Sequence, residues 1–206
     1  MEDAIIIKNK EKIMGILKQT GRQGIGALLI YLDKTDFYTA PASARYHLSE
    51  QGGLAHHSLT VYNELMNLFS KGLFNAIDGW RSVAIVSLLH DLCKIDMYSP
   101  EQRWRKNANN EWEQYPAYGY DEKFYYGHGE KSAYIASEFI RLEDEEAQAI
   151  RAHMGFSDSS FKGGDRTIPN IFASNELALY LSFADQIATF QKESNCGTKN
   201  QRVYIV

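Results

Sequence analysis

The segment Val83-Ala84-Ile85-Val86-Ser87-Leu88-Leu89-His90-Asp91-Leu92-Cys93-Lys94 decides the fold. Apolar side chains occupy nearly every side of a helix drawn through it, which predicts a helix that is buried all round. Near its end, this helix places an imidazole next to a carboxylate, His90 and Asp91. A buried, unpaired carboxylate costs several kcal/mol, so Asp91 needs a cation or several donors. Two interpretations are open: a divalent metal ion, or an N–H donor within a helix junction.

Length and composition place this helix in one folded unit. The chain has 206 residues, 44% of them hydrophobic, which predicts a single domain over residues 1–206 with its core at 52–192. A charged fraction of 23% and a net charge of -4 exclude a disordered chain and a strongly basic coat protein. The two cysteines, Cys93 and Cys196, lie far apart, so we expect no disulfide framework.

The location of the protein follows from the segments it lacks. No stretch approaches the roughly 20 apolar residues of a membrane helix, and residues 1–12 lack the basic start and cleavage site of a signal peptide. We therefore expect a cytoplasmic protein without membrane contact. The sequence indicates neither a protein partner nor an oligomeric state.

Apolar residues recur at helical spacing through most of the chain, which predicts an all-α fold. A loop that contains Pro41 is expected over residues 35–51. The predicted helices lie at residues 9–32 (two short helices broken near Gly21), 54–71, 79–94, 129–141, 143–153 and 175–192.

Residues 98–126 depart from this pattern and form an aromatic insertion. A turn-like run at Asn107–Asn110 divides it, so we interpret residues 103–115 as a β-hairpin. The rings either seal the edge of the core or form a flap whose flat faces hold a nucleobase. The aromatic residues of this segment are Tyr98, Trp104, Trp112, Tyr115, Tyr118, Tyr120, Phe124, Tyr125 and Tyr126.

Helical spacing indicates which histidines point inward. His57 lies within the apolar stripe of its predicted helix, whereas His56 shares a side with Thr60 and Asn63. His57 should therefore face the core and His56 the solvent. A lone histidine on an apolar face is more often a hydrogen-bonded core residue than a metal ligand, so the interpretation depends on its neighbours.

Further donors repeat this inward placement on other predicted helices. His153 follows Ile150 by one turn, Asp185 follows Leu181 by four residues, and His128 stands between two glycines at a helix start. Imidazoles and carboxylates without thiolates favour a catalytic site for one or two divalent ions, Mn²⁺, Fe²⁺, Co²⁺, Ni²⁺, Zn²⁺ or Mg²⁺, over a sulfur-rich structural zinc site. The candidate ligands are His57, His90, Asp91, His128, His153 and Asp185.

The order of these residues resembles the H…HD…H…H…D pattern of the HD superfamily of metal-dependent phosphohydrolases. The strings that carry the resemblance span residues 52–189 and are similar to the HD domain of bacterial 3′-to-5′ exoribonucleases and to small phage or prophage HD hydrolases. These strings are GGLAHHSL (52–59), LLHDLCK (88–94), GHGEKS (127–132), AHMG (152–155) and ADQIAT (184–189).

The resemblance implies an HD-type helical bundle and a ligand set. His57, His90, Asp91 and Asp185 would hold one metal ion, and Asp91 would bridge to a second ion. His128 and His153 would complete that second site. Met154, where some family members have a second histidine, is not a ligand for a hard ion.

Several side chains are candidates for contact with substrate. Lys94 lies one turn beyond His90-Asp91, where its ammonium could reach a phosphate oxygen, and relatives often have lysine there; it could instead be a solvated residue at a helix end. His47, in the predicted loop, could protonate a leaving group or simply lie at the surface. Three more basic side chains could line the mouth of the site or be ordinary solvated charges: Lys131, Lys162 and Arg166.

The function expected from this pattern is hydrolysis of a phosphomonoester or phosphodiester through a metal-activated water. The aromatic segment favours a nucleotide or a short single-stranded nucleic acid as substrate, and the net charge of -4 argues against long duplex. Two alternatives remain open: a nucleotide-sensing module without turnover, and a di-iron oxygenase on the same scaffold.

Overall fold

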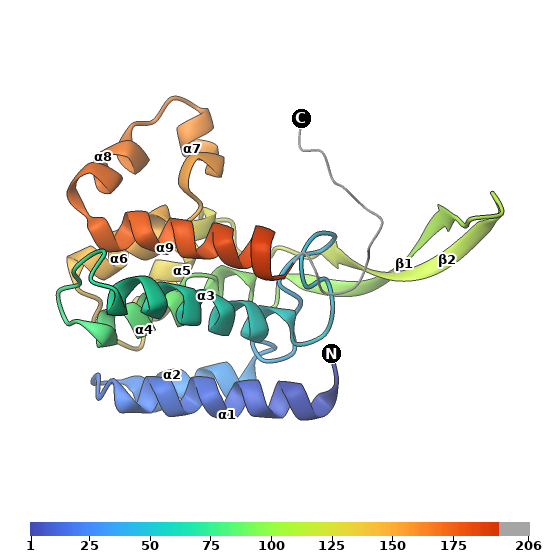
Figure 1. Cartoon of the computed structure of the whole chain (residues 1–206). Coiled ribbons are helices and arrows are strands. Elements are labelled where there is room, and N and C mark those ends of the chain that lie inside the picture. The colour runs from blue at the N-terminus through green and yellow to red at the C-terminus, as the bar shows by residue number, and fades with distance from the viewer. Residues whose placement is uncertain (194–206) are drawn as a thin grey trace.

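A computed structural model describes residues 1–193, and Cys196 lies outside this range. The described chain is mostly helical, with one small antiparallel hairpin, as the sequence predicts. Figure 1 shows the helices gathered in one body and the hairpin extending away from it. The α-helices are α1 (Asp3–Gln19), α2 (Ile25–Lys34), α3 (Gly53–Ser70), α4 (Trp80–Leu89), α5 (His128–Ser137), α6 (Asp144–Ala152), α7 (Ser159–Lys162), α8 (Thr167–Ser174) and α9 (Glu176–Ile187).

Helix α4 lies at the centre of the body. Every residue from Ser82 to Leu89 is buried, and the helix packs against α1, α3, α5, α6 and α9. It is shorter than predicted: the α-helix ends at Leu89, and a short 3₁₀ helix, η1 (Leu92–Lys94), follows. Asp91 between them has φ -109° and ψ 22°, outside the α-helical region.

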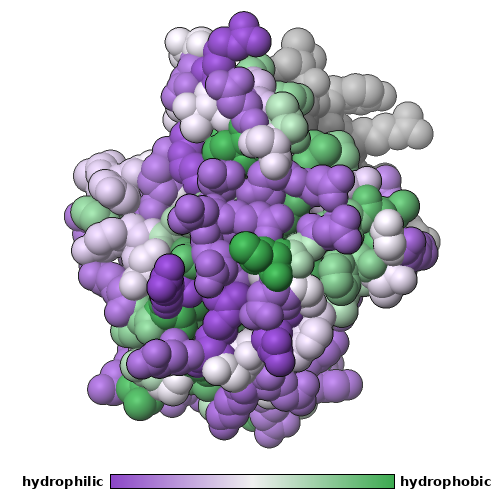
Figure 2. Space-filling view, turned by 90° about the vertical axis from the view of Figure 1, so that its left-hand side faces the viewer, coloured by the Kyte–Doolittle hydropathy of each residue, from purple (hydrophilic) through white to green (hydrophobic). Residues whose placement is uncertain are grey.

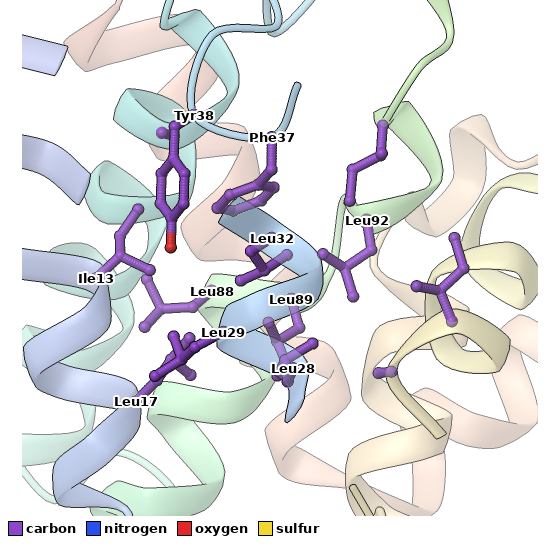
Figure 3. Packing of buried hydrophobic residues seen from close by; sticks show 14 of the residues in the cluster. Ile13, Leu17, Leu28, Leu29, Leu32, Phe37, Tyr38, Leu88, Leu89 and Leu92 are labelled. Carbon is purple, nitrogen blue, oxygen red and sulfur yellow. The ribbon is translucent and has the colours of Figure 1, made fainter. Parts of the chain in front are cut away.

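Two apolar clusters flank α4. In the first, Ile13 and Leu17 of α1 and Leu28 of α2 meet Leu88 and other residues of the α4 end (Figure 3). The second cluster joins α3, α4, α6 and α9 through buried residues that include Val61, Val86, Ile150 and Leu181. Burial of each such side chain contributes about 1.5–3 kcal/mol. The central position of α4 follows from its apolar surface on both sides.

Other helix predictions also need correction. The last predicted helix is α9 followed by a π-helix, η3 (Ala188–Lys192). Helix α5 ends at Ser137, short of the predicted residue 141, because the chain turns toward Ile140, which is buried in the first cluster. Helices α7 and α8 were not predicted, since the polar, glycine-containing segment around Gly163-Gly164 lacks a long apolar period.

The hairpin is longer than the predicted residues 103–115. Strand β1 (Tyr98–Lys106) pairs with β2 (Trp112–Tyr120), from Tyr98 opposite Tyr120 to Lys106 opposite Trp112. Each strand contains a proline, which a two-stranded ribbon tolerates because each strand has a free edge. The turn lies where the sequence predicts it: the Asn107 side chain accepts hydrogen bonds from the backbone N–H groups of Asn109 and Glu111.

The two ends of the body have different surfaces. Hydrophilic residues cover most of the end opposite the hairpin, with hydrophobic residues scattered among them (Figure 2). At the hairpin end, large rings face solvent: Trp104 is 60% and Trp112 is 65% exposed. These two rings therefore do not seal the core. No described helix has the length and apolarity that a membrane crossing requires.

Candidate metal centre

The site begins where α4 ends. His90 Nδ1 lies 2.8 Å from the carbonyl oxygen of Ser87, one turn earlier. A carbonyl only accepts, so Nδ1 carries the proton, and Nε2 keeps its lone pair and points into the site. His153 at the end of α6 has the same arrangement, with Nδ1 2.7 Å from the Ile150 carbonyl oxygen. Each helix end thus orients one imidazole in the tautomer that binds a metal ion.

His57 on α3 is held by carboxylates on both ring nitrogens. Its Nδ1 lies 3.0 Å from Glu193 Oε2, and its Nε2 lies 3.1 Å from Asp185 Oδ1. The inward position predicted for His57 is confirmed: it is 1% exposed. A carboxylate on the far nitrogen of a ligating histidine fixes the ring and increases its basicity. Glu193 was not a predicted site residue.

The carboxylate of Asp91 stands at the centre of the cluster, and His128 and His153 lie near its first oxygen. Oδ1 is 2.9 Å from His128 Nε2 and 3.5 Å from His153 Nε2. His153 Nε2 is buried and makes no hydrogen bond within residues 1–193. A buried nitrogen with a free lone pair beside a carboxylate oxygen is what an ion-binding position provides.

The second oxygen of Asp91 faces three nitrogen atoms. Oδ2 is 2.7 Å from Lys94 Nζ, 3.4 Å from His90 Nε2 and 3.6 Å from His57 Nε2. The local reason is the break after α4, which lets His90 and Asp91 point toward one centre although adjacent residues on a helix diverge by about 100°. The helix end at this pair, which comes earlier than the predicted end at residue 94, is therefore essential to the site.

A close helix contact brings His128 to the cluster. A Cβ added at Gly129 would lie 2.2 Å from the Arg151 carbonyl oxygen, so only glycine allows α5 to approach α6 this closely. The His128 and His153 rings consequently stand with their centroids 5.2 Å apart. The glycine beside His128 thus explains how the start of α5 reaches the end of α6.

The side chains of the cluster differ in exposure. His57, His90, Asp91 and His153 are at most 2% exposed as residues. The side chain of His128, in contrast, is 28% exposed. His128 is therefore the most accessible of these ligands, and the side chains of Asp185 and Lys94 are 16% and 12% exposed.

The charges of the cluster shift the pKa values of its members. Burial opposes charge on His57, but Asp185 and Glu193 outweigh it and raise the pKa of His57 to about 10. Burial likewise opposes charge on His128, yet the neighbouring Cys93 and Asp91 raise its pKa to about 10. The pKa of Asp91 is well below its usual value, because Lys94 and the imidazoles outweigh burial. In the metal-free protein, protons on imidazoles balance the carboxylates.

Four overlapping donor groups could hold a metal ion, with ligand atoms within 4.8 Å of one another. Each group contains at least one predicted ligand, and three of the groups together include all six predicted residues. The groups are His57/His90/Asp185, His90/Asp91/His153, Asp91/Cys93/His128 and His47/His57/Glu193. The side chains present therefore fit the divalent ion that the sequence predicts, and its identity is not determined by them.

Cys93 revises the expectation of a thiol-free donor set. Its Sγ lies 3.4 Å from His128 Nδ1 and belongs to a donor group with Asp91 and His128. The sequence contains a signal for it, because Cys93 follows Asp91 by two residues at a helix end. A soft sulfur atom next to imidazole shifts the preference of this group toward Zn²⁺ or Fe²⁺ over Mg²⁺.

His47 lies in the predicted loop and reaches the edge of the cluster. Its Nε2 is 3.8 Å from Glu193 Oε2, and its ring centroid is 5.0 Å from that of His57. Burial, with the nearby His57 and Lys94, lowers the pKa of His47 to about 4, so the ring is uncharged near pH 7. It is not a surface histidine, and its role as general acid stays a prediction.

The other predicted cations lie elsewhere. Lys131 is nearly buried and pairs with Glu122, 2.7 Å from Nζ to Oε1. Lys162 on α7 and Arg166 before α8 are exposed, and no described contact joins either to the Asp91 cluster. The structure thus brings Lys94 alone of these four side chains to Asp91, and contact of the other three with substrate stays a prediction.

The geometry of the site is accordingly that of a buried donor cluster around one carboxylate, with His128 as its most accessible ligand. Its members come from α3, the end of α4, the start of α5, the end of α6, α9 and the residue after η3. Comparison of the chain with protein-family models, with curated proteins and with solved structures gives no match.

Proposed function

We propose that this chain is a metal-dependent phosphohydrolase of the HD type that cleaves a phosphate ester of a nucleotide or a short single-stranded nucleic acid. The observation that carries the proposal is the convergence of four imidazoles, His57, His90, His128 and His153, on the carboxylate of Asp91. Hydrogen bonds within the protein alone leave this arrangement incomplete, because His153 Nε2 lies 3.5 Å from Asp91 Oδ1 and makes no hydrogen bond among the described residues.

Separate donor groups would hold the divalent ions. His57, His90 and Asp185 form one group, and Asp91 links His90 and His153 with His128. When bound, such ions lower the pKa of a water molecule and neutralise charge on phosphate oxygens. The protein orients the ligands: backbone carbonyls hold His90 and His153, and Glu193 holds His57.

Lys94 is the side chain best placed to bind a substrate phosphate. Burial disfavours its charge, but Asp91 at 2.7 Å raises the pKa of Lys94 above its ordinary value, so the ammonium is charged at neutral pH. Its side chain is 12% exposed, so the ammonium is partly accessible. An ammonium with three donors at this position can hold a phosphate oxygen against the donor cluster.

Hydrolysis of bis-p-nitrophenyl phosphate with added Mn²⁺ tests the proposal. We expect nitrophenol release that EDTA stops, and that Asp91→Ala reduces to background because it removes the shared ligand. Asp165→Ala is the matched control: it removes an exposed carboxylate that bonds Thr167, away from the cluster. Equal activity of the Asp91 variant and the wild type would refute the assignment.

Two other outcomes would replace the proposal. Tight nucleotide binding without any product after long incubation, across a panel of nucleotides and short oligonucleotides, would indicate a sensing module. Oxygen-dependent consumption of a polyol, together with an iron-linked absorbance, would indicate a di-iron oxygenase. Metal analysis of the purified protein separates these cases and identifies the ion.

A further inference from the structure

The two faces of the β1–β2 hairpin differ in chemistry. Residues directly opposite one another in an antiparallel pair share a face, so the register assigns every other pair to the same side. One face contains no carboxylate, and its only charged residue is Lys106 near the tip. We call it the aromatic face, and it consists of Tyr98, Pro100, Gln102, Trp104, Lys106, Trp112, Gln114, Pro116, Tyr118 and Tyr120.

The other face carries the remaining charges of the strands, and they neutralise each other. Arg103 pairs with Glu101, and Arg105 Nε lies 2.6 Å from Glu113 Oε1. The guanidinium of Arg105 also covers the ring of Tyr115, 5.0 Å from its centroid. This face therefore satisfies its own polar groups, whereas the aromatic face presents rings to solvent: Trp104, Trp112 and Tyr120 are 60%, 65% and 66% exposed.

The aromatic face begins four residues after Lys94. The backbone N–H of Met97 donates to the Lys94 carbonyl oxygen at 3.3 Å, and the next residue, Tyr98, is the first of the face; its ring centroid lies 5.4 Å from that of Tyr120. The backbone N–H of Asp121 donates to the Met97 carbonyl oxygen and ties the base of the hairpin to the segment after η1. A molecule bound at Lys94 can therefore extend along the aromatic face.

Part of this face lines a pocket at the base of the hairpin. The pocket has a volume of about 510 Å³ and lies between residues 49–51 of the loop and the Pro100, Pro116 and Tyr118 side of the hairpin. The pocket has two acidic residues, and both are paired: Glu50 with the amino group of Met1 at 2.8 Å, and Glu101 with Arg103. A flat, apolar group fits this pocket better than a charged one.

From these observations we infer that the aromatic face binds a single-stranded oligonucleotide, whose bases stack on its rings while one phosphate lies at the metal centre. This inference rests on the proposed function and names its substrate class. Bases stack on exposed aromatic rings whatever their sequence. Lys106 at the tip, whose ammonium lies 5.7 Å from the centroid of the Trp112 ring, provides a positive charge for the phosphate backbone. The nine residues of β1 span about 30 Å at about 3.3 Å per residue, enough for roughly four or more nucleotides.

Binding without cleavage tests this inference independently of catalysis. The probes are fluorescein-labelled twelve-residue oligothymidylate and oligouridylate, measured by fluorescence anisotropy in EDTA. We expect Trp104→Ala/Trp112→Ala to weaken binding of at least one probe by about tenfold or more, since each stacked ring contributes to affinity. Tyr115→Ala, an aromatic truncation on the opposite face, should stay within about twofold of the wild type.

Three results would overturn the inference. The first is equal binding by the tryptophan variant and the wild type, and the second is equal loss in the Tyr115 variant. The third is a change from dimer to monomer in the tryptophan variant, by analytical ultracentrifugation, without loss of oligonucleotide affinity; the face would then bind a second copy of the chain. Far-ultraviolet circular dichroism checks that both variants fold.

Failure of the proposed function gives a different pattern. If the wild type binds oligonucleotides through the aromatic face but hydrolyses neither them nor the nitrophenyl ester with Mn²⁺, the hydrolase proposal fails and the binding inference stands. If both hold, the ratio of kcat/KM for the oligonucleotide to that for the small ester should fall about tenfold or more in the tryptophan variant. That ratio should not change in Tyr115→Ala.

Discussion

The molecule has two fully buried carboxylates, Glu146 and Asp91, and their surroundings differ. Glu146 on α6 is fully buried, yet it accepts hydrogen bonds from the guanidinium of Arg22, from Ser82 Oγ at 2.6 Å and from the backbone N–H of Glu143 at 3.0 Å. Asp91 is equally buried and contacts Lys94 Nζ at 2.7 Å and His128 Nε2 at 2.9 Å, but two further imidazoles beside it, His90 and His153, are held by backbone carbonyls through their far nitrogens. The protein satisfies Glu146 internally, whereas the Asp91 cluster contains more donor groups than its carboxylate needs, and these groups could hold an ion.

The difference separates stability from function. Breaking a satisfied buried pair leaves an uncompensated charge and destabilises the fold. A cluster that depends on an ion instead gains free energy when the ion binds, and it responds to pH because the ligands must lose protons. The two regions can be changed separately, the first through Arg22 and the second through pH, metal ions and Glu193.

The largest effect is expected from pH on metal affinity. His57 and His128 have pKa values raised to about 10, so metal binding displaces protons from both. The apparent affinity for Zn²⁺ should increase with pH between 6 and 8, by up to about tenfold per pH unit for each proton displaced. Isothermal titration calorimetry in buffers of different ionisation enthalpy counts these protons. An affinity that does not change with pH would contradict the prediction.

The same protons also make the free energy of unfolding of the metal-free protein depend on pH. The unfolded chain loses them near the ordinary histidine pKa of 6.5, and the folded chain keeps them until about 10. The free energy of unfolding should therefore decrease as pH rises through this window. Saturating metal should weaken this dependence, which chemical denaturation at several pH values checks.

The next largest effect is expected at the internally satisfied region. Arg22→Ala removes the cation from buried Glu146, and the free energy of unfolding should fall by about 3–5 kcal/mol. The metal stoichiometry of the folded variant should be unchanged, because Arg22 does not contact the Asp91 cluster. Urea denaturation and metal analysis measure the two quantities. Arg81→Ala, which removes an exposed partner of Asp78, is the control and should cost less than about 1 kcal/mol.

Metal addition should stabilise the wild type by a smaller amount. At a free metal concentration of about one hundred times Kd, linkage predicts about 2.7 kcal/mol of added stability. Thermal unfolding with and without Mn²⁺ or Zn²⁺ measures it, and Asp91→Ala should lose most of the gain. An equal gain in the Asp91 variant would place the ion elsewhere on the molecule.

The smallest effect is expected at the residue behind His57. Glu193→Gln keeps the size of the side chain but removes the charge 3.0 Å from His57 Nδ1. Metal affinity should fall about 10- to 100-fold, as for other carboxylates behind a ligating histidine. Glu64→Gln is the control. Glu64 pairs with Lys192, the residue before Glu193, and lies outside the cluster. Equal affinity in all three proteins would remove Glu193 from the site.

Much of the helical body could be predicted from residue spacing. The apolar surface of residues 83–89 indicated a central helix, and α4 is buried throughout. The periodicity also placed His57 inward correctly, because a residue's face on a helix depends only on its position in the turn. The hairpin turn at Asn107–Asn110 was predicted for a similar local reason, although the strands extend beyond the predicted residues 103–115.

Other members of the site depend on contacts between distant segments. Glu193 lies beyond the last predicted helix and meets His57 across 136 positions of sequence. A π-helix, which no apolar period indicates, precedes it. Cys93 reaches His128 through the contact between η1 and α5, where the backbone N–H of Cys93 donates to Ser132 Oγ at 3.0 Å. Spacing within one helix carries no information on such approaches.

By itself, then, the sequence determined the helical class, the buried helix at residues 83–89 and the inward orientation of the candidate ligands, since these follow from local periodicity. The tertiary structure alone decided that the ligands meet at Asp91, that Glu193 and Cys93 join them, and that Lys131 is held by Glu122. Distances between elements are set by how whole helices pack, and that packing depends on every side chain in the interface.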